Sequence, residues 1–236
     1  MHGPLQDPRL ELIERFFSGT GPTYDFIVNA ATFGIDRRWK REIVGTLPSR
    51  PNRILDLACG TGILTFRIAR RYPACRVVGV ELRDEYLNIA RTKAAKKGLK
   101  NVEFVLARAE DYHSDRPFDA IVSSYLAKYA VLDSLTRNCH AMLRPGGILV
   151  MHDFTYPPEE YLVRIWRLYF RMLQSIGSPL LPQWRDIFSG LPDLIRTTRW
   201  CEELERALVQ YQFEEIRFRP LTLYGSTLAT ARRAGH

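Results

Sequence analysis

Two features at the ends of neighbouring predicted strands have the residue types needed to bind a nucleoside. Residues 56–62, with the sequence DLACGTG, follow a short apolar strand and precede a helix, and their small side chains let the backbone turn sharply and approach a ligand. Glu81 ends the next predicted strand, where a carboxylate can accept hydrogen bonds from both hydroxyls of a ribose. Ligands of open parallel sheets bind at the carboxyl ends of the strands. We therefore predict a cofactor site there, in preference to an ordinary tight turn and a solvated carboxylate.

The glycine spacing distinguishes between cofactors. A dinucleotide fingerprint has its third glycine three residues after the second, and Thr65 stands at that position here. The chain also contains no Gly-Lys-Ser or Gly-Lys-Thr phosphate loop. The spacing thus favours a nucleoside without a bridging pyrophosphate over NAD. The four cysteines are widely separated, so no metal site is predicted.

Two polar residues at the end of the fifth predicted strand are candidates for a general base. His152 and Asp153 follow the apolar run 148–151, and the end of that strand is expected to point at the cofactor cleft. A base with a pKa near neutrality would remove a proton from a bound substrate. For His152, packing near the edge of the sheet is an equally good interpretation, because histidine serves either role.

The elements that would position these residues alternate along the chain. Strands are predicted at 53–57, 76–81, 102–106, 118–124 and 148–152. Helices are predicted at 9–18, 24–46, 63–71, 84–98, 159–176 and 199–211, and one more ends at Met142. Alternating strands and helices indicate a parallel sheet covered on both faces. The last two strand-like runs, 213–219 and 221–231, are close enough to pair as an antiparallel hairpin.

We expect one α/β domain spanning residues 1–236, because no Gly- or Ser-rich linker divides the chain. Its expected parts are an N-terminal helical cap (1–50), a cofactor-binding core (51–158), a helical insert or lid (159–198), and a last helix with two closing strands (199–236). In the insert, Arg164, Arg167 and Arg171 share one helical face. The opposite face is apolar, with Leu162, Ile165, Trp166, Tyr169, Phe170 and Leu173. Packing on the core is the simpler interpretation, and a lid or a shallow contact with anionic lipid is the functional one.

Composition excludes several classes of protein. With 46% hydrophobic and 25% charged residues the chain is neither disordered nor a coiled coil, and no apolar run is long enough to span a bilayer. The N-terminal sequence MHGPLQDPRLELIERFF lacks the pattern of a secretory signal, so a cytoplasmic protein is expected, with peripheral membrane contact as an option. The net charge of +8 suits acidic partners, but no basic tail or separate RNA-binding domain accompanies it, which disfavours nucleic acid. The oligomeric state stays open.

Several segments resemble the motifs of class I S-adenosylmethionine-dependent methyltransferases. They are ILDLACGTG (54–62), VVGVEL (77–82), ARAEDY (107–112), FDAIVSS (118–124) and LRPGGILVMHDF (143–154). The N-terminal run TYDFIVNAATFGIDRRWKR (23–41) and the closing run LTLYGSTLATARR (221–233) are similar to the UbiE/COQ5 group, which C-methylates quinone precursors. The resemblance implies a Rossmann-like, mostly parallel sheet with a C-terminal antiparallel strand pair. It also implies S-adenosyl-L-methionine as cofactor and S-adenosyl-L-homocysteine as product.

The resemblance assigns roles residue by residue. The cofactor-binding positions are Tyr24, Asp56, Ala58, Gly60, Thr61, Gly62, Glu81, Leu82, Arg108, Ala109, Glu110 and Ser124. The candidate catalytic residues are His152, Asp153, Tyr125 and Lys128. Arg108 and Ala109 would flank the adenine, and Tyr24 would cover the cofactor from the cap.

The chain departs from the quinone methyltransferases at two places. Cys59 replaces the first glycine of their usual turn, and 125–129 (YLAKY) replaces a run that carries an Arg and an Asn beside the substrate, although Lys128 keeps a positive charge. We expect methyl transfer to a small, lipophilic quinol or phenolic acceptor. The alternatives are another small molecule, RNA, or a non-catalytic partner subunit that binds S-adenosylmethionine.

Overall fold

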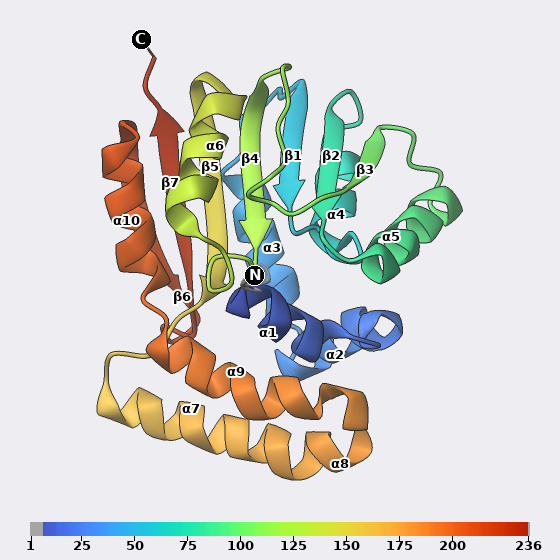
Figure 1. Cartoon of the computed structure of the whole chain (residues 1–236), viewed down its shortest axis with the longest axis vertical. Helices are drawn as coiled ribbons and strands as arrows, with labels where there is room; N and C mark the ends of the chain where they lie inside the picture. Colours follow the sequence, from blue (N-terminus) through green and yellow to red (C-terminus); the bar gives the residue numbers. More distant parts are fainter. Residues whose placement is uncertain (1–6, 236) are drawn as a thin grey trace, which may run out of the picture.

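The computed structural model describes residues 7–235 and has a seven-stranded sheet at its centre (Figure 1). The first six residues of the segment compared with a signal peptide lie outside this range. The strands are β1 (Arg53–Leu57), β2 (Arg76–Glu81), β3 (Val102–Leu106), β4 (Phe118–Ser124), β5 (Leu143–Phe154), β6 (Phe213–Leu221) and β7 (Ser226–Arg233). Their order is β3-β2-β1-β4-β5-β7-β6, with β1 to β5 parallel and β7 antiparallel to both neighbours. The expected α/β class and the antiparallel closing pair are therefore confirmed.

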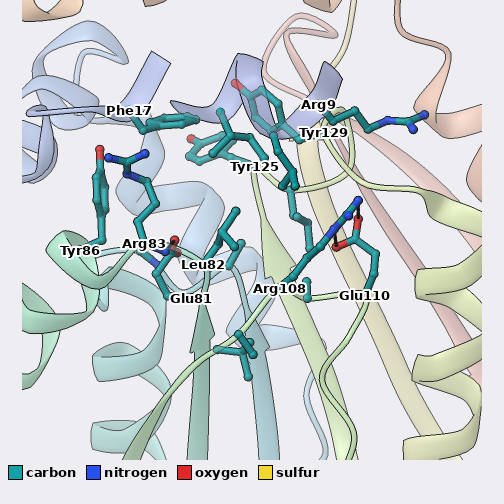
Figure 2. A pocket seen from close by; sticks show the side chains of 18 of the residues that line it. Arg9, Phe17, Glu81, Leu82, Arg83, Tyr86, Arg108, Glu110, Tyr125 and Tyr129 are labelled. Atoms are coloured by element: carbon teal, nitrogen blue, oxygen red, sulfur yellow. Dashed lines mark hydrogen bonds and ion pairs between the residues drawn. The ribbon is translucent and has the colours of Figure 1, made fainter. Parts of the chain in front are cut away.

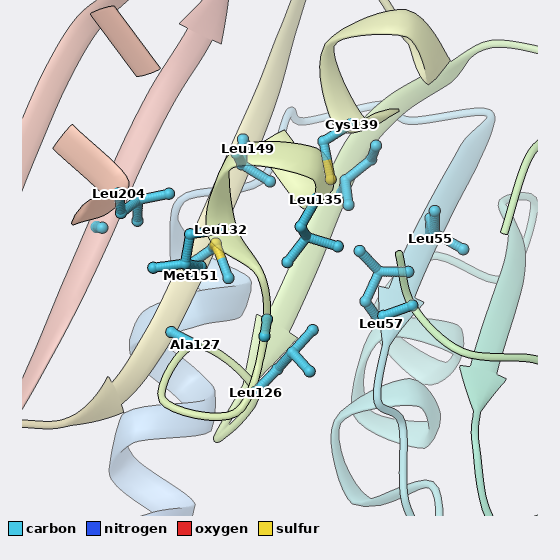
Figure 3. Close-up of a cluster of buried hydrophobic side chains, with 14 of the residues drawn as sticks. Leu55, Leu57, Leu126, Ala127, Leu132, Leu135, Cys139, Leu149, Met151 and Leu204 are labelled. Carbon is cyan, nitrogen blue, oxygen red and sulfur yellow. The ribbon is translucent and has the colours of Figure 1, made fainter. Parts of the chain in front are cut away.

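Both faces of the parallel strands are apolar, because successive side chains of a strand point to opposite sides. The flanking helices are α4 (Ile63–Arg71), α5 (Asp84–Lys96), α6 (Leu132–Met142) and α10 (Trp200–Gln210). Leu55 and Leu57 of β1 pack in one cluster with α6 and α10, whereas Ile54 packs in another with α4. Figure 3 shows the first cluster, in which Leu132, Leu135 and Cys139 of α6 lie over β1, β4 and β5.

Helix α3 (Ile35–Gly45) packs beside α4 on the same face of the sheet, through Trp39 and Ile43. The other helices gather at or beyond the carboxyl ends of the parallel strands (Figure 1). They are α1 (Pro8–Phe17), η1 (Gly21–Thr23), α2 (Tyr24–Ala31), α7 (Glu160–Met172), η2 (Leu173–Gly177), α8 (Ser178–Leu180), η3 (Pro182–Trp184) and α9 (Arg185–Thr197). A separate apolar cluster joins the N-terminal helices to α9 through Phe16, Ile27, Ile187 and Phe188. Within residues 7–235, no helix combines the length and apolarity needed to cross a membrane.

The predicted helix over 24–46 is wrong in one respect, because two helices occupy this segment. Phe33 and Gly34 have φ values of 50° and 76°, and a left-handed residue at this position ends a helix. The N–H of Gly34 donates to the carbonyl of Asn29 at 2.8 Å, which closes α2 before α3 begins.

Within the expected helical insert, α9 runs through Pro192. Proline lacks the N–H that would bind the carbonyl four residues earlier, which is that of Phe188. The side chain of Gln174 donates to this carbonyl at 3.1 Å. A tertiary contact, which local sequence does not reveal, therefore permits the proline inside the helix. The strand limits shift as well: β5 starts at Leu143, and β7 starts at Ser226 after the turn 222–225.

Candidate active site

The turn after β1 has a backbone that only small residues adopt easily. Ala58, Gly60 and Gly62 have φ values of 53°, 57° and 89°, in the left-handed region. A Cβ on Gly62 would lie 2.5 Å from the ring of Phe66, so close packing also requires glycine there. Asp56 is 1% exposed and accepts a hydrogen bond from Thr65 at 2.6 Å, and burial raises its pKa to about 7. Asp56 therefore anchors the turn.

Glu81 lies at the carboxyl end of β2 and is held by the backbone. Its two carboxylate oxygens accept hydrogen bonds from the N–H groups of Gly60 and Arg83, both at 2.9 Å. Burial raises the pKa of Glu81, and these N–H donors counteract that rise. Each carboxylate oxygen keeps a further lone pair that can accept from a ribose hydroxyl.

A cleft between β1, β2 and β4 and the helix α1 contains the predicted cofactor residues (Figure 2). Leu82, Arg108, Ala109 and Glu110 line it beyond Glu81, and Arg108 pairs with Glu110 at 3.0 Å. The carboxylate of Glu110 also accepts from the N–H of Val131 at 3.0 Å. The roof consists of Arg9, Leu10, Ile13 and Phe17 from α1, which the sequence did not predict as site residues.

A smaller pocket continues the cleft past the glycine turn. Asp56, Ala58, Gly60, Thr61, Ser124, Tyr24 and Tyr125 line it together with Lys40 from α3. Lys40 is buried and pairs with Asp36 at 2.6 Å, and its ammonium also donates to Ser124 at 3.0 Å. The sequence analysis missed this pair. Its signal is an acid and a base four residues apart on the face of 35–45 that also carries Trp39 and Ile43.

A second cavity, of about 420 Å³, adjoins the cofactor cleft on the side of the helical insert. Its walls are almost entirely apolar and come from α2, α7, α9, the end of β5 and the β6–β7 turn. Phe17, Tyr24, Tyr125 and Tyr129 line both this cavity and the cofactor cleft. We call these four residues the shared wall. They form the boundary between the cofactor cleft and the cavity.

Lys128 carries the single charge among the described residues that line this cavity. Its ammonium pairs with the carboxylate of Asp153, and the ring centroids of Tyr125 and Tyr129 lie 5.4 and 4.7 Å away. Burial lowers the pKa of Lys128, while Asp153 opposes this change. The ammonium can therefore interact with an oxygen of an acceptor in an environment of low dielectric.

Tyr125 has a strained and well-fixed position in the shared wall. Its φ is 72°, its hydroxyl donates to Asp36 at 2.6 Å, and its ring stacks on Phe154 with centroids 4.8 Å apart. Non-glycine residues in this backbone region are uncommon and cluster at functional sites. Burial raises the pKa of Tyr125 well above its usual value, so the phenol stays neutral.

The structure corrects the expectation that His152 and Asp153 point at the cleft. Both are 0% exposed, and neither lines the cleft or the cavity. His152 Nδ1 lies 3.0 Å from the hydroxyl of Ser124, and burial lowers the pKa of His152 well below its usual value. Asp153 accepts from Lys128 and from the N–H of Phe154. His152 and Asp153 thus contact residues that line the site, Ser124 and Lys128, and do not line it themselves.

The sheet order and the acidic residue that ends β2 are those of the class I S-adenosylmethionine-dependent methyltransferases, whose cofactor is S-adenosylmethionine. A family model described as a methyltransferase domain matches residues 54–147. The chain is 31% identical over 222 residues to the ubiquinone/menaquinone biosynthesis C-methyltransferase UbiE of Shewanella sp. W3-18-1, covering 92% of this chain and 88% of the relative. It is 28% identical over 229 residues to the demethylmenaquinone methyltransferase of Bacteroides fragilis, covering 94% and 93%. The chain belongs to the UbiE family of methyltransferases.

A solved structure has the same fold. The geranyl diphosphate C-methyltransferase of Streptomyces coelicolor aligns with a TM-score of 0.64 at 16% identity, over 98% of this chain and 90% of the other. The residues in the cleft fit S-adenosylmethionine, because the left-handed turn allows close approach and Glu81 offers free lone pairs at its ribose end. The positions assigned to individual site residues stay predictions.

Proposed function

We propose that the enzyme transfers the methyl group of S-adenosylmethionine to a ring carbon of a lipophilic quinol or phenol held in the apolar cavity. The observation that carries the proposal is the shared wall, because Tyr24 and Tyr125 line the cofactor cleft, its smaller extension and the cavity. Two relatives are named for methylation in menaquinone or ubiquinone biosynthesis, which supports an acceptor of this class.

The walls of the cavity suit an acceptor that is mostly hydrocarbon. Aromatic side chains from distant segments, including Trp39, Trp166, Tyr169 and Trp184, surround it. Such walls exclude water and hold the ring by apolar burial, which favours the alignment that an in-line methyl transfer needs.

Lys128 would supply the electrostatic part of the reaction. A phenolic oxygen bound beside its ammonium loses its proton more readily, because the positive charge stabilises the phenolate. The phenolate in turn raises the electron density of the ring carbon that takes the methyl group. Asp153 holds the ammonium in place. The ring carbon would bond to the methyl group as the bond between that methyl and the cofactor sulfur breaks. The same ring carbon would then lose its hydrogen as a proton and the phenolic oxygen would regain one, so that one proton in total passes to solvent.

The cofactor supplies an electrophilic methyl group, and the chain orients it. Ser124 ends β4 and Tyr125 follows it, at the junction of the cleft and its smaller extension, and Tyr125 also lines the cavity. Tyr24 covers this junction from the cap, and its ring stacks on Trp184 of the insert with centroids 6.0 Å apart. Cap and insert thus meet above the reacting atoms and keep water away.

The test uses methyl-labelled S-adenosylmethionine with three acceptors: a reduced prenylated naphthoquinol, a reduced prenylated benzoquinol and total RNA. We expect label on a ring carbon of a quinol, and at least a hundredfold lower turnover in Lys128→Met, in the range found for removal of one donor to a developing oxyanion. Lys97→Met, at an exposed lysine directly after α5, is the matched control. Label in RNA, or full turnover in Lys128→Met, would contradict the proposal.

A further inference from the structure

The outer side of the helical insert carries a continuous row of exposed apolar side chains. Helix α7 is the outermost element in Figure 1, with α9 between it and the sheet. The row, which we call the α7 stripe, has exposed fractions between 37% and 73%. It consists of Tyr161, Ile165, Leu168, Met172, Ile176 and Leu180.

The spacing of the stripe keeps it on one side of the helical insert. Steps of three and four residues return to the same face of an α-helix. Residues 173–177 form a π-helical turn, which has more residues per turn than an α-helix. The steps of four residues from Met172 to Ile176 and from Ile176 to Leu180 therefore stay on the same side of the insert. The stripe therefore extends through α7 and η2 to Leu180 in α8.

The stripe is continuous with the rim of the acceptor cavity. Ile165 belongs to the stripe and also lines the cavity. Phe33 and Leu223, from the α2–α3 junction and the β6–β7 turn, line the cavity too, and they are 71% and 66% exposed. Three separate elements thus place large apolar side chains around the opening.

Two of the exposed residues at the rim have a strained backbone conformation. Phe33 and Leu223 have φ values of 50° and 53°, where bulky residues are rarely found. Phe33 is tied to α7, because its ring contacts that of Tyr169, whose hydroxyl donates to the carbonyl of Ala31 at 2.7 Å. Strain of this kind persists where the surroundings enforce it, and it is concentrated at functional positions.

Arginines flank the stripe on the side away from the cavity. Arg164, Arg167 and Arg171 are exposed and share one helical face. Arg164 pairs with Glu160 at 2.6 Å, whereas no ion pair within residues 7–235 engages Arg167 or Arg171. A helix with an apolar stripe beside a basic row is suited to lie in the interface of an anionic bilayer. The net charge of +8 adds to this attraction.

We propose that the α7 stripe and the cavity rim form a docking face for an anionic lipid bilayer, from which the acceptor enters the cavity directly. The proposal rests on the proposed function for the nature of the acceptor. The lipid contact itself follows from the exposed stripe, the rim and the two unpaired arginines. A bilayer supplies both partners that this face lacks, an apolar layer and negative headgroups.

The experiment is flotation of the full chain with phosphatidylcholine vesicles that contain either no anionic lipid or about one third phosphatidylglycerol. We expect binding to the anionic vesicles, and a partition coefficient about fivefold lower for each of Arg167→Gln and Arg171→Gln, the effect of one basic residue near an anionic leaflet. High salt should weaken binding in the same direction. Equal binding to both vesicle types, or to neither, overturns the proposal.

A matched pair of substitutions tests the location of the face. Leu168 in the stripe is 63% exposed and Val209 on the distant helix α10 is 64% exposed, and neither lines the cavity. Leu168→Glu should lower the partition coefficient at least tenfold, whereas Val209→Glu should leave it unchanged. Equal effects of the two substitutions overturn the proposal. A wild-type dimer that Leu168→Glu dissociates also overturns it, because the stripe would then bind a second copy.

Vesicle binding is measured without cofactor and without acceptor, so its result is independent of methyl transfer. Calorimetric binding of S-adenosylhomocysteine to each variant shows that the fold is intact. If the chain binds anionic vesicles but labels no quinol, the proposed function fails and the docking face stands. If the chain labels a quinol in detergent but binds no vesicle, the proposed function stands and the docking face fails.

Discussion

The ammonium of Lys128 contacts the carboxylate of Asp153 at a place where the two side chains are 2% and 0% exposed. Lys128 reaches the acceptor cavity, and Asp153 lies behind it, at the end of β5. Removing one partner of a buried ion pair leaves a charge in a medium that cannot solvate it. Under the proposed function, stability and activity would therefore both depend on this contact.

Asp153→Asn should lower the free energy of unfolding by about 3–5 kcal/mol, because it leaves the Lys128 ammonium without its counter-charge. Urea unfolding followed by circular dichroism measures this change. Asp193→Asn is the control, since Asp193 pairs with Arg196 at 3.1 Å on the exposed surface, where such pairs contribute about 0–1 kcal/mol. Similar losses of unfolding free energy in the two variants would show that the buried ion pair contributes no more to stability than the exposed one.

Turnover should fall as the pH rises through the lowered pKa of Lys128. Burial disfavours the charged ammonium, so deprotonation begins below the usual value of 10.5. The free energy of unfolding changes in the opposite sense. Between the lowered pKa and 10.5, Lys128 binds more protons in the unfolded chain than in the folded one, so the folded state becomes more stable as the pH rises across that window. Lys128→Arg keeps the charge at all accessible pH values and should remove the falling limb of the kcat profile. If the falling limb of the kcat profile is unchanged in Lys128→Arg, another group causes it.

Gly62→Ala should prevent cofactor binding and destabilise the fold by more than strain alone would. A Cβ at Gly62 would lie 2.5 Å from the Phe66 ring, and the φ of 89° is unfavourable for alanine. Gly98→Ala separates the two effects, because Gly98 has a φ of 63° with nothing within 4 Å of the added carbon. We expect a loss of about 1 kcal/mol in the control and clearly more in Gly62→Ala, measured by thermal unfolding. Equal losses would show that the contact with Phe66 relaxes.

Glu81→Ala should weaken binding of S-adenosylhomocysteine by about 2–4 kcal/mol, since each hydrogen bond to a charged group contributes about 1.5–3 kcal/mol. Isothermal calorimetry gives the affinity directly. Glu103→Ala, which removes an exposed carboxylate paired with Arg76 at 2.8 Å, is the control and should bind normally. Undiminished affinity in Glu81→Ala would remove Glu81 from the ribose site.

The sequence predicted those parts of the molecule that short segments determine. The strands β1 to β4 match their predicted limits because each is a short apolar run between turn residues. Glu81 and the turn that follows β1 could be recognised because the sequence alone indicates where each of these strands ends. Neither judgement required contacts between distant residues.

Tertiary contacts decided the rest. The acceptor cavity combines side chains from 17–39, 125–129, 154–191 and 222–225, which nothing local brings together. His152 is buried against Trp39 and Tyr125, whose ring centroids lie 5.2 and 5.3 Å from its own. Helix α9 passes Pro192 because Gln174 satisfies the freed carbonyl. Ile165, expected on the packed face, is 54% exposed because it lies at the rim of the cavity.

Helix α1 has a consequence for the timing of the reaction. It roofs the cofactor cleft and is fastened at both ends, by Asp7 to Arg108 at 2.7 Å and by Glu14 to Arg83. If spent cofactor leaves past this roof, the two ion pairs must open and the helix must lift. Turnover would then be paced by product release, and the acceptor side of the enzyme could reload while the cofactor side is still closed.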